Sequence, residues 1–236
     1  MNGQHLSPNN HSDGVSYGFY PGLFRPTSMS QFFQIHPDNP QARLIRQAVE
    51  IIRQGGLVIY PTDSSYALGC QIGDKAAMER IRRIRRLDDN HNFTLVCRDL
   101  SEIASYARID NQHYRLLKNL TPGPYTFIHR ATKQVPRRLQ NPRRKTIGIR
   151  VPDNRIVQAL LAELGEPIMS STLILPGDHM PLTDPYEMKD SLSHAVDLII
   201  DGGYCGFEPT TVVDMEGDTP KVLRLGKGDA VMLEQV

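Results

Sequence analysis

The order of apolar and polar positions predicts alternating helices and strands along most of the chain. Apolar residues recur between Leu44 and Ile52 at the spacing of one helix face, and Gly55-Gly56 ends this helix. The run Leu57-Val58-Ile59-Tyr60 is apolar throughout, as in a buried strand, and Pro61 stops it. This part of the chain is therefore a helix that leads directly into a strand.

The same periodicities predict the remaining elements. Further helices are expected after the capping residue Asp74 and over residues 100–106, 110–120 and 153–164, with a short acidic helix after Pro185. Further strands are expected over residues 30–33, 93–97, 125–129, 146–151, 168–173, 196–200, 211–214 and 222–225. Because helices and strands alternate, while the last strands have little helix between them, we predict an α/β fold (α+β in the strict sense) with a mixed sheet.

The chain is long enough for one sizeable domain, with 236 residues of which 39% are hydrophobic. Residues 1–28 are polar and rich in Asn, Ser, Gly and Pro, and they lack the basic start and apolar centre of a secretory signal. We therefore expect a disordered tail over residues 1–28 and a single domain over residues 29–236. Whether translation starts at Met1 or at Met29 stays open.

The content of cysteine, histidine and apolar residues narrows the class of protein. The 3 cysteines are widely spaced, which suggests neither a disulfide framework nor a zinc site and favours a reducing cytoplasm. The 8 histidines show no metal-ligand spacing, and we interpret His91 and His129 as ordinary polar or packing residues. No uninterrupted apolar run is long enough for a transmembrane helix. We expect a cytoplasmic protein without a membrane partner or a metal site of its own.

Four small polar residues, Thr62-Asp63-Ser64-Ser65, follow the strand over residues 57–60 at its carboxyl end. In sheets covered by helices, ligands bind at the carboxyl ends of strands, where hydroxyl and carboxylate groups can bind a polar substrate. The same residue types also form plain turns, so both interpretations stay open on the residues alone. The sequence contains no Ser/His/Asp triad pattern, HExxH motif or Walker loop, and we assign no catalytic residue.

The chain resembles the YrdC/YciO family at several motifs that occur in the family's order. The stretch from Pro61 to Gly69 is similar to PT-(D/E)-T-x-YGLG, with Ser64 in place of Thr and Ala67 in place of Gly. Later motifs are similar to PGP-x-T, T-(V/I)-(A/G)-(V/I)-R-x-P, (P)-S-T-V-V-D and (L/I)-R-x-G, at residues 121–126, 146–152, 209–214 and 223–226. The resemblance extends from Ser30 to the C-terminus and is greatest to the YciO branch.

The resemblance implies a fold and an activity. Members of the family have a twisted mixed sheet with helices on its convex side and a concave, positively charged cleft. YrdC-type members make threonylcarbamoyl-AMP from L-threonine, bicarbonate and ATP and release pyrophosphate, and the product serves the modification of an adenosine in tRNA. The family is also associated with binding double-stranded RNA. Attack on an α-phosphate requires charge neutralisation and alignment more than an acid–base pair, which agrees with the lack of a catalytic motif.

Position in the family's motifs implies which residues bind each ligand. The threonine would be bound by Thr62, Ser64, Arg150 and Thr210, with its carboxylate on Arg150. The nucleotide, ATP with Mg²⁺ as a substrate complex, would be bound by Arg85, Thr146, Ser170, Thr172 and Arg224. Arginine suits both roles because its planar guanidinium can make bidentate contacts to carboxylate and phosphate groups. The alternative for any one arginine is a solvated surface ion pair, which contributes little.

The sequence departs from the synthase pattern at two nucleotide-facing positions. The family's K-x-R falls on Arg85-Arg86-Leu87, and its S-x-N falls on Thr172-Leu173-Ile174. Leu87 and Ile174 cannot contact a triphosphate by charge or by a hydrogen bond. We therefore predict a weak threonylcarbamoyl-AMP synthase, and the alternative is a non-catalytic module that binds tRNA or ribosomal RNA.

The formal net charge is +1, but the basic residues are unevenly distributed. They cluster in the predicted helix after Asp74 and in the loop before Thr146, while acidic residues gather late in the chain. With the resemblance, we predict that double-stranded RNA or tRNA binds at Arg82, Arg83, Arg86, Arg137, Arg138, Arg143, Arg144 and Lys145. The alternative is ordinary solvated surface. We interpret Phe93 and Tyr125 as core residues rather than base-stacking platforms.

Overall fold

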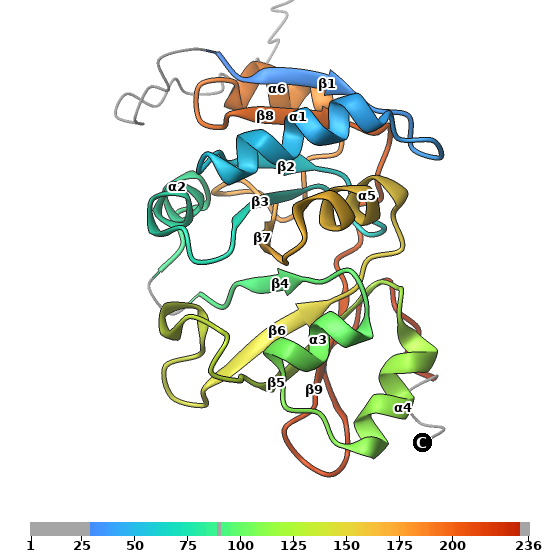
Figure 1. Ribbon diagram of the computed structural model, residues 1–236. Coiled ribbons are helices and arrows are strands. Elements are labelled where there is room, and N and C mark those ends of the chain that lie inside the picture. Colours follow the sequence, from blue (N-terminus) through green and yellow to red (C-terminus); the bar gives the residue numbers. More distant parts are fainter. Residues whose placement is uncertain (1–28, 89–90, 232–236) are drawn as a thin grey trace, which may run out of the picture.

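The computed structural model describes residues 29–88 and 91–231 (Figure 1). The strands among them are β1 (Gln31–Gln34), β2 (Val58–Tyr60), β3 (Ala67–Gln71), β4 (Thr94–Val96), β5 (Tyr125–Arg130), β6 (Thr146–Arg150), β7 (Ile168–Thr172), β8 (Leu198–Asp201), β9 (Thr211–Asp214) and β10 (Lys221–Arg224). The helices are α1 (Ala42–Arg53), α2 (Lys75–Arg85), α3 (Leu100–Tyr106), α4 (Asn111–Leu120), α5 (Arg155–Leu164), α6 (Pro185–Leu192) and the 3-10 helix η1 (Arg137–Leu139). The tail expected over residues 1–28 lies outside the described residues.

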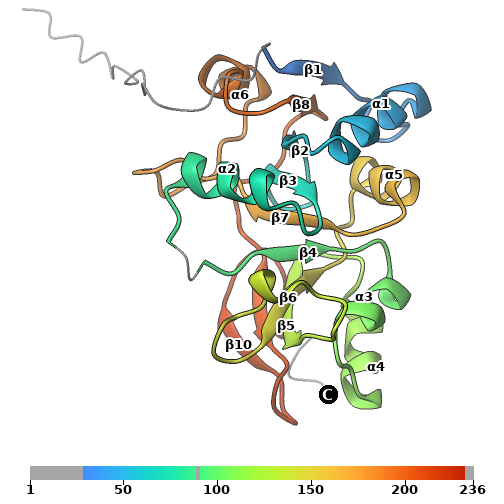
Figure 2. The same ribbon diagram turned by 60° about the vertical axis from the view of Figure 1, so that its left-hand side comes forward.

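The strands of the described residues form one 10-stranded sheet in the order β1-β8-β2-β3-β7-β4-β6-β5-β9-β10. Figures 1 and 2 show this order from β1 at the top to β9 and β10 at the bottom. Four neighbouring pairs are parallel, namely β1–β8, β8–β2, β4–β6 and β5–β9. The other pairs are antiparallel. The sheet is therefore mixed, as the sequence pattern predicts.

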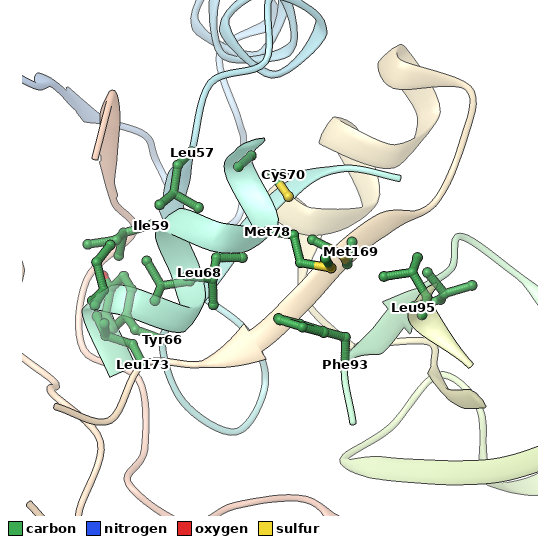
Figure 3. Packing of buried hydrophobic residues seen from close by; sticks show 14 of the residues in the cluster. Leu57, Ile59, Tyr66, Leu68, Cys70, Met78, Phe93, Leu95, Met169 and Leu173 are labelled. Atoms are coloured by element: carbon green, nitrogen blue, oxygen red, sulfur yellow. The ribbon is translucent and has the colours of Figure 1, made fainter. Parts of the chain in front are cut away.

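One face of the sheet carries the largest part of the apolar core. Helices α2, α3 and α6 pack there against alternate residues of β2, β3, β4, β6 and β7. Figure 3 shows part of this packing, in which Met78 of α2 lies near Leu68 and Met169 of the sheet. Helix α4 covers the same face further along, through contacts of Leu116 with Phe127 and its neighbours. These helices therefore leave that face largely closed to solvent.

The opposite face is covered over only part of its length. Helices α1 and α5 contact each other and pack on Val58, Tyr60 and Ile168. In the described part of the chain, their apolar cluster extends no further along the sheet than Val96 of β4. Helices therefore cover both faces near β1, β8 and β2, whereas at β5, β6 and β9 this second face lies beyond the apolar cluster of α1 and α5.

Small polar residues line the part of this second face that lies beyond the apolar cluster of α1 and α5. Thr94 is paired with both Gly148 and Ser170 in the neighbouring strands. A Cβ atom at Gly148 would lie 3.2 Å from Thr94 Oγ1 and 3.3 Å from Thr126 Cγ2, so glycine keeps the surface between these hydroxyls flat. Since side chains alternate along a strand, a set of neighbours shares this face. We call this set the polar floor: Thr94, Thr126, Thr146, Gly148, Ser170 and Thr172.

Helix α2 begins and ends where its sequence provides caps. The Asp74 carboxylate accepts a hydrogen bond from the Ala77 N–H at 2.9 Å, as the sequence predicts. At the other end Arg86 adopts a left-handed conformation with φ +49°, and the Leu87 N–H returns to the Arg82 carbonyl at 2.9 Å. This closure turns the chain sharply and leaves Arg85 beside the end of β7.

Strand β3 is an element that the sequence pattern does not predict. Its residues Ala67 and Gly69 have low strand propensity, and they follow the polar turn closely. Gly69 is required by packing, because a Cβ atom there would lie 2.5 Å from Tyr60 Cε1 and 2.7 Å from Ile168 Cγ2. The strand is therefore specified by its neighbours β2 and β7 rather than by its own residues.

Among the described residues, no helix combines the length and the apolar character needed to cross a bilayer. Cys70, Cys97 and Cys205 are buried free thiols. Burial raises the pKa of each thiol, in the case of Cys205 to about 11. All three cysteines are therefore protonated, unreactive parts of the core at neutral pH.

Candidate functional site

The turn between β2 and β3 closes around the side chain of Thr62. The Thr62 hydroxyl donates to the Ser65 carbonyl at 2.6 Å and accepts the N–H groups of Ser64 and Ser65, each at 3.2 Å. The side chains of Thr62, Ser64 and Ser65 are buried. These residues therefore form an ordered, hydrogen-bonded part of the interior rather than a plain surface loop.

Arg150, at the end of β6, brings a positive charge to this turn. Its Nη2 forms an ion pair with Asp63, and its Nη1 donates to Ser64 Oγ at 3.3 Å. The Asp153 N–H donates to Asp63 Oδ2 at 3.0 Å, and the Lys227 ammonium donates to the Asp63 carbonyl. The side chains of Arg150 and Asp63 are each only 9% exposed, so water screens their interaction weakly.

Arg150 has more donors than these contacts use. A guanidinium has about five N–H groups, and Asp63 and Ser64 accept from two of its nitrogens. The third, Nε, is buried and has no hydrogen-bond partner within the described part of the chain. Burial raises the pKa of neighbouring Tyr60 to about 12, although the Ser170 hydrogen bond and the Arg150 charge act in the opposite direction. Arg150 is therefore a buried cation with capacity to bind a further acceptor.

Thr210 and Arg224 form a second polar group, beside β9 and β10. Arg224 Nη2 donates to the Thr210 carbonyl at 3.0 Å and lies 3.4 Å from its hydroxyl. The hydroxyls of Thr210 and Thr126 are 2.8 Å apart, which joins this group to the polar floor. Burial lowers the pKa of Arg224 below its usual value. The structure therefore brings together Thr210, predicted to bind threonine, and Arg224, predicted to bind the nucleotide.

The other predicted nucleotide-binding hydroxyls belong to the polar floor. Thr146 and Ser170 are buried, while Thr172 is partly exposed at the end of β7. Ser170 Oγ accepts from the Tyr60 hydroxyl at 2.6 Å and donates to the Leu68 carbonyl at 3.2 Å. The Ser170 hydroxyl therefore joins neighbouring strands, and a ligand would have to displace one of these partners.

Arg85, at the end of α2, is held against the end of β7. Its Nη1 donates to Ser171 Oγ, and its Nε donates to the Ile174 carbonyl at 3.3 Å. His91 Nε2 lies 3.2 Å from the same Ser171 hydroxyl. Burial, and then the charge of Arg85, lowers the pKa of His91 to about 4, so this imidazole is neutral at neutral pH. Because side chains alternate along β7, Ser171 and Met169 face α2, whereas Ser170 and Thr172 face the polar floor. Arg85 is thus bound to protein groups on the α2 face of the sheet, and the structure does not bring it together with Thr146 and Ser170.

The two residues that depart from the synthase pattern have no polar role. Leu87 is partly buried and packs against the largest apolar cluster. Ile174 is also partly buried, and only its backbone carbonyl takes part in binding Arg85. The structure therefore offers no second side-chain cation or amide at these two positions.

The residues predicted to bind RNA divide between different parts of the structure. Arg138 of η1 donates to the Gly73 carbonyl, next to the start of α2. Arg144 instead forms ion pairs with Asp214 and Glu216 beside β9. The remaining members lie in α2 and at its C-cap (Arg82, Arg83, Arg86), in η1 (Arg137) and in the loop before β6 (Arg143, Lys145).

Sequence reasoning missed several groups that complete the site. Asp63 stands inside the recognised motif, and its opposite charge could have indicated a pair with Arg150. Thr126 is the last residue of the recognised motif over residues 121–126, although no role was assigned to it. Lys227 comes to the site only through the order of strands in the sheet, and no local pattern identifies it. In contrast, the prediction that Phe93 and Tyr125 are core residues is confirmed by their burial.

The positive charge of the site comes from arginine and lysine side chains. Within residues 29–88 and 91–231, no group of three His, Cys, Asp or Glu side chains could hold a metal ion. The fold and the site together define a single α/β domain with a buried, arginine-centred polar site. Such a site is suited to an anionic ligand, because guanidinium groups bind carboxylates and phosphates with defined geometry.

Comparison with known proteins identifies the family. The family model Sua5/YciO/YrdC, described as telomere recombination, matches residues 50–226. The chain therefore belongs to the Sua5/YciO/YrdC family, which confirms the resemblance seen in its motifs.

Individual relatives agree with this assignment. The chain is 64% identical over 201 residues to "Uncharacterized protein YciO" of Escherichia coli (strain K12), covering 85% of this chain and 98% of the relative. The crystal structure of E. coli YciO matches with a TM-score of 0.84 and 63% identity, over 87% of this chain and 100% of that chain. The YciO-like fold is thus shown by both sequence and structure.

More distant relatives carry functional names. The threonylcarbamoyl-AMP synthase of Vibrio vulnificus (strain YJ016) is 28% identical over 161 residues, which cover 67% of this chain and 86% of that protein. The crystal structure of P. abyssi Sua5 complexed with L-threonine matches with a TM-score of 0.77 and 25% identity, over 84% of this chain and 58% of that chain. The chain is therefore related to threonylcarbamoyl-AMP synthases.

Proposed function

We propose that this chain is a cytoplasmic protein that binds L-threonine and ATP with Mg²⁺, and that it makes threonylcarbamoyl-AMP slowly for the modification of an adenosine in tRNA. The observation that carries this proposal is Arg150, a buried cation that has unused donors and stands beside the hydroxyls of Thr62 and Ser64. A relative named threonylcarbamoyl-AMP synthase and one crystallised with L-threonine support it.

The chemistry requires alignment and charge neutralisation. The threonine amine and bicarbonate give a carbamate with loss of water, and a carbamate oxygen then attacks the α-phosphorus. The bond between the α-phosphorus and its bridging oxygen breaks, and pyrophosphate leaves. Arg150 would hold the threonine carboxylate, while Arg224 beside Thr210 would offset negative charge on the nucleotide. Both arginines are fixed by protein contacts, so little reorganisation is needed when a ligand binds.

The nucleotide side of the site explains why the reaction would be slow. Arg85 already donates to Ser171 and Ile174, and a phosphate would have to compete with these acceptors. Leu87 packs on the apolar core and offers the leaving group no charge. The protein would therefore bind its substrates better than it stabilises the transition state.

Calorimetric titration with L-threonine tests the amino-acid site directly. Wild-type protein should bind L-threonine but not L-threoninamide, because the amide lacks the carboxylate that Arg150 would hold. Arg150→Lys should weaken binding roughly tenfold or more, since an ammonium cannot make the bidentate contact. Arg46→Ala, at an exposed position of α1, is the matched control and should bind normally.

Because Arg150 is buried, Arg150→Lys could fold poorly, and a second variant keeps the test valid in that case. Ser64→Ala removes one hydroxyl and leaves the ion pair of Arg150 with Asp63 intact. It should fold normally and still lose affinity for L-threonine. If wild-type protein binds L-threonine and L-threoninamide equally, or binds neither, the proposed amino-acid site is wrong.

A non-catalytic RNA-binding module is the second candidate, and the contacts of Arg85 and Leu87 favour it. In that case the protein would bind duplex RNA or tRNA and release no pyrophosphate from ATP, threonine and bicarbonate. Measuring pyrophosphate release and RNA affinity on the same preparation separates the two candidates. Release that requires all three substrates would exclude the non-catalytic candidate.

A further inference from the structure

Lys227 follows β10 and brings a further cation to the arginine-centred site. Its ammonium donates to the carbonyl of Asp63, the residue whose carboxylate is paired with Arg150. A lysine ammonium has about three N–H donors, and this contact uses one of them. Within the described residues, Lys227 forms no ion pair, so its charge is not neutralised by a carboxylate. Lys227 therefore has both charge and donors to offer a ligand.

The backbone around Lys227 is held by a buried residue of the neighbouring strand β9. The Gly226 N–H donates to the Thr211 hydroxyl at 3.0 Å, and the same hydroxyl donates to the Gly228 carbonyl at 2.6 Å. Thr211 is 0% exposed, so water does not compete for these bonds. The Lys227 N–H in turn donates to the Pro209 carbonyl at 2.9 Å. The protein therefore fixes the point from which the Lys227 side chain extends.

The residues on either side of Lys227 must be small for this segment to approach the sheet. A Cβ atom at Gly226 would overlap the Pro209 carbonyl oxygen, and one at Gly228 would collide with the Tyr125 ring. Glycine allows such a close approach because it has no Cβ atom. The Lys227 side chain itself is exposed. A closely packed backbone therefore presents an ammonium that a ligand can reach.

The Lys227 side chain connects the two polar groups of the site. Its backbone is bonded to the residue before Thr210, whose carbonyl accepts from Arg224. Its ammonium is bonded to Asp63, which pairs with Arg150. A ligand with a carboxylate on Arg150 and a nucleotide on Arg224 therefore has its middle part beside the Lys227 ammonium.

The nucleotide side of the site otherwise has little positive charge. Arg85 is bound on the α2 face of the sheet, and Leu87 packs on the apolar core. Attack on an α-phosphate spreads negative charge over its oxygens, and a cation held nearby stabilises this charge. Arg224 supplies one such cation, and Lys227 is placed to supply another.

We propose that Lys227 is a substrate-binding residue, whose ammonium binds the α-phosphate where it becomes joined to the carbamate. In this step a carbamate oxygen forms a bond to the α-phosphorus, the bond from phosphorus to the bridging oxygen breaks, and pyrophosphate leaves with that electron pair. Lys227 stays protonated and donates a hydrogen bond to a non-bridging oxygen of the α-phosphate. The inference rests on the proposed function, since it assigns a contact within the same site.

Calorimetric titration with AMP and with adenosine tests this contact, because only AMP carries the phosphate. Lys227→Met should weaken AMP binding roughly tenfold and leave adenosine binding unchanged. Lys227→Arg keeps the charge and should retain most of the AMP affinity. Lys118→Met is the matched control, since Lys118 is exposed on α4, which covers the opposite face of the sheet.

Kinetics separate a contact in the reaction from a merely structural role. Lys227→Met should lower kcat for pyrophosphate release roughly tenfold and keep KM for L-threonine, because the carboxylate would still lie on Arg150. A structural role would instead weaken the binding of AMP, adenosine and L-threonine together and lower the melting temperature.

Four results would overturn the inference: wild-type protein that does not bind AMP, equal AMP affinity in Lys227→Met and wild type, an equal loss in Lys118→Met, or parallel losses for AMP and adenosine. The proposed function fails in a different way. Wild-type protein that binds AMP through Lys227 but releases no pyrophosphate would refute the synthase reaction and support the phosphate contact. Wild-type protein that binds AMP through Lys227 but not L-threonine would refute only the amino-acid site.

Discussion

Two arginines that are both predicted to face a ligand differ in how the protein uses their donors. Arg150 has one carboxylate and one hydroxyl as partners, and its Nε–H is unused within the described residues. Arg85 is bound to a serine hydroxyl and a backbone carbonyl, and burial lowers its pKa. An incoming anion therefore gains more from Arg150 than from Arg85, which is why the amino-acid side of the site is the better supported.

The pair of Asp63 with Arg150 should be important for stability. Removing one partner of a buried ion pair leaves an uncompensated charge, so we expect Asp63→Asn to lower the free energy of unfolding by about 3 kcal/mol. Urea denaturation measures this change, and Asp218→Asn, at an exposed position, is the control. A carboxylate ligand would replace the lost partner, so L-threonine should raise the melting temperature of Asp63→Asn more than that of wild type. Equal stability of variant and wild type would contradict this role.

His129 should make stability depend on pH. It is 0% exposed, and neither ring nitrogen has a hydrogen-bond partner among the described residues. Burial, and then the charge of His113, lowers the pKa of His129 to about 4, while Asp110 and Asp214 act in the opposite direction. The unfolded chain takes up a proton near pH 6.5, whereas the folded protein does so only near pH 4. Stability is therefore full above about pH 6.5 and falls as the pH decreases towards 4.

As the pH decreases from 7 to 5, protonation of His129 in the unfolded chain should lower the free energy of unfolding by about 2 kcal/mol. The variant His129→Leu cannot titrate, so its unfolding free energy should fall less over this range. His91, whose pKa is also lowered to about 4, leaves part of the dependence in place. His194→Gln, at an exposed position, should keep the wild-type profile. Identical profiles for wild type and His129→Leu would show that His129 does not titrate as proposed.

At the scale of elements, β3 shows what a local pattern cannot predict. Helix α2 follows from its cap at Asp74 and its apolar stripe, both of which lie within a dozen residues of sequence. Strand β3 instead depends on Tyr60 and Ile168, which reach Gly69 from neighbouring strands. Packing against distant residues therefore decides the element, and propensity alone would leave it as a loop.

We expect Gly69→Ala to destabilise the protein by about 2 kcal/mol, because its methyl group would collide with the Tyr60 ring and with Ile168. Thermal or urea denaturation measures the effect. Gly217→Ala is the matched control, since a Cβ atom there would meet nothing closer than the Thr219 carbonyl oxygen at 3.9 Å. If both variants are equally stable, the close packing around β3 is not a constraint.

For the whole molecule, the site is assembled by the order of strands in the sheet. The turn after β2, the end of β6 and the segment around β9 are far apart in sequence, and the order β2-β3-β7-β4-β6-β5-β9 brings them to one face. Family motifs predicted Arg150, Thr210 and Arg224, but not that Thr210 binds Arg224 or that Lys227 reaches the Asp63 carbonyl. Such contacts depend on long-range pairing, which periodicity along the chain does not encode.

The nucleotide side of the whole site leads to a prediction about rate. Leu87 and Ile174 replace two groups that would each contribute about 1.5–3 kcal/mol as charge-assisted hydrogen bonds. If these contributions are independent, the loss is roughly 3–6 kcal/mol, or on the order of a hundredfold to ten-thousandfold in rate. Wild-type protein should therefore release pyrophosphate from ATP, threonine and bicarbonate far more slowly than an ordinary enzyme, for which about 1–1000 turnovers per second are typical.

Restoring one of these groups should raise the rate. Ile174→Asn places an amide beside Arg85 at a partly buried position, whereas Leu87→Arg would disturb the apolar core and is the poorer choice. We expect Ile174→Asn to speed pyrophosphate release roughly tenfold. This factor corresponds to about 1.4 kcal/mol, or about half of the free energy that one charge-assisted hydrogen bond contributes. Met180→Asn, at a 51% exposed position of the following loop, should leave the rate unchanged. Turnover of ordinary speed in wild type would mean that Arg85 and Thr172 suffice for the nucleotide. A folded Ile174→Asn variant without any gain would instead mean that this part of the site binds a different ligand.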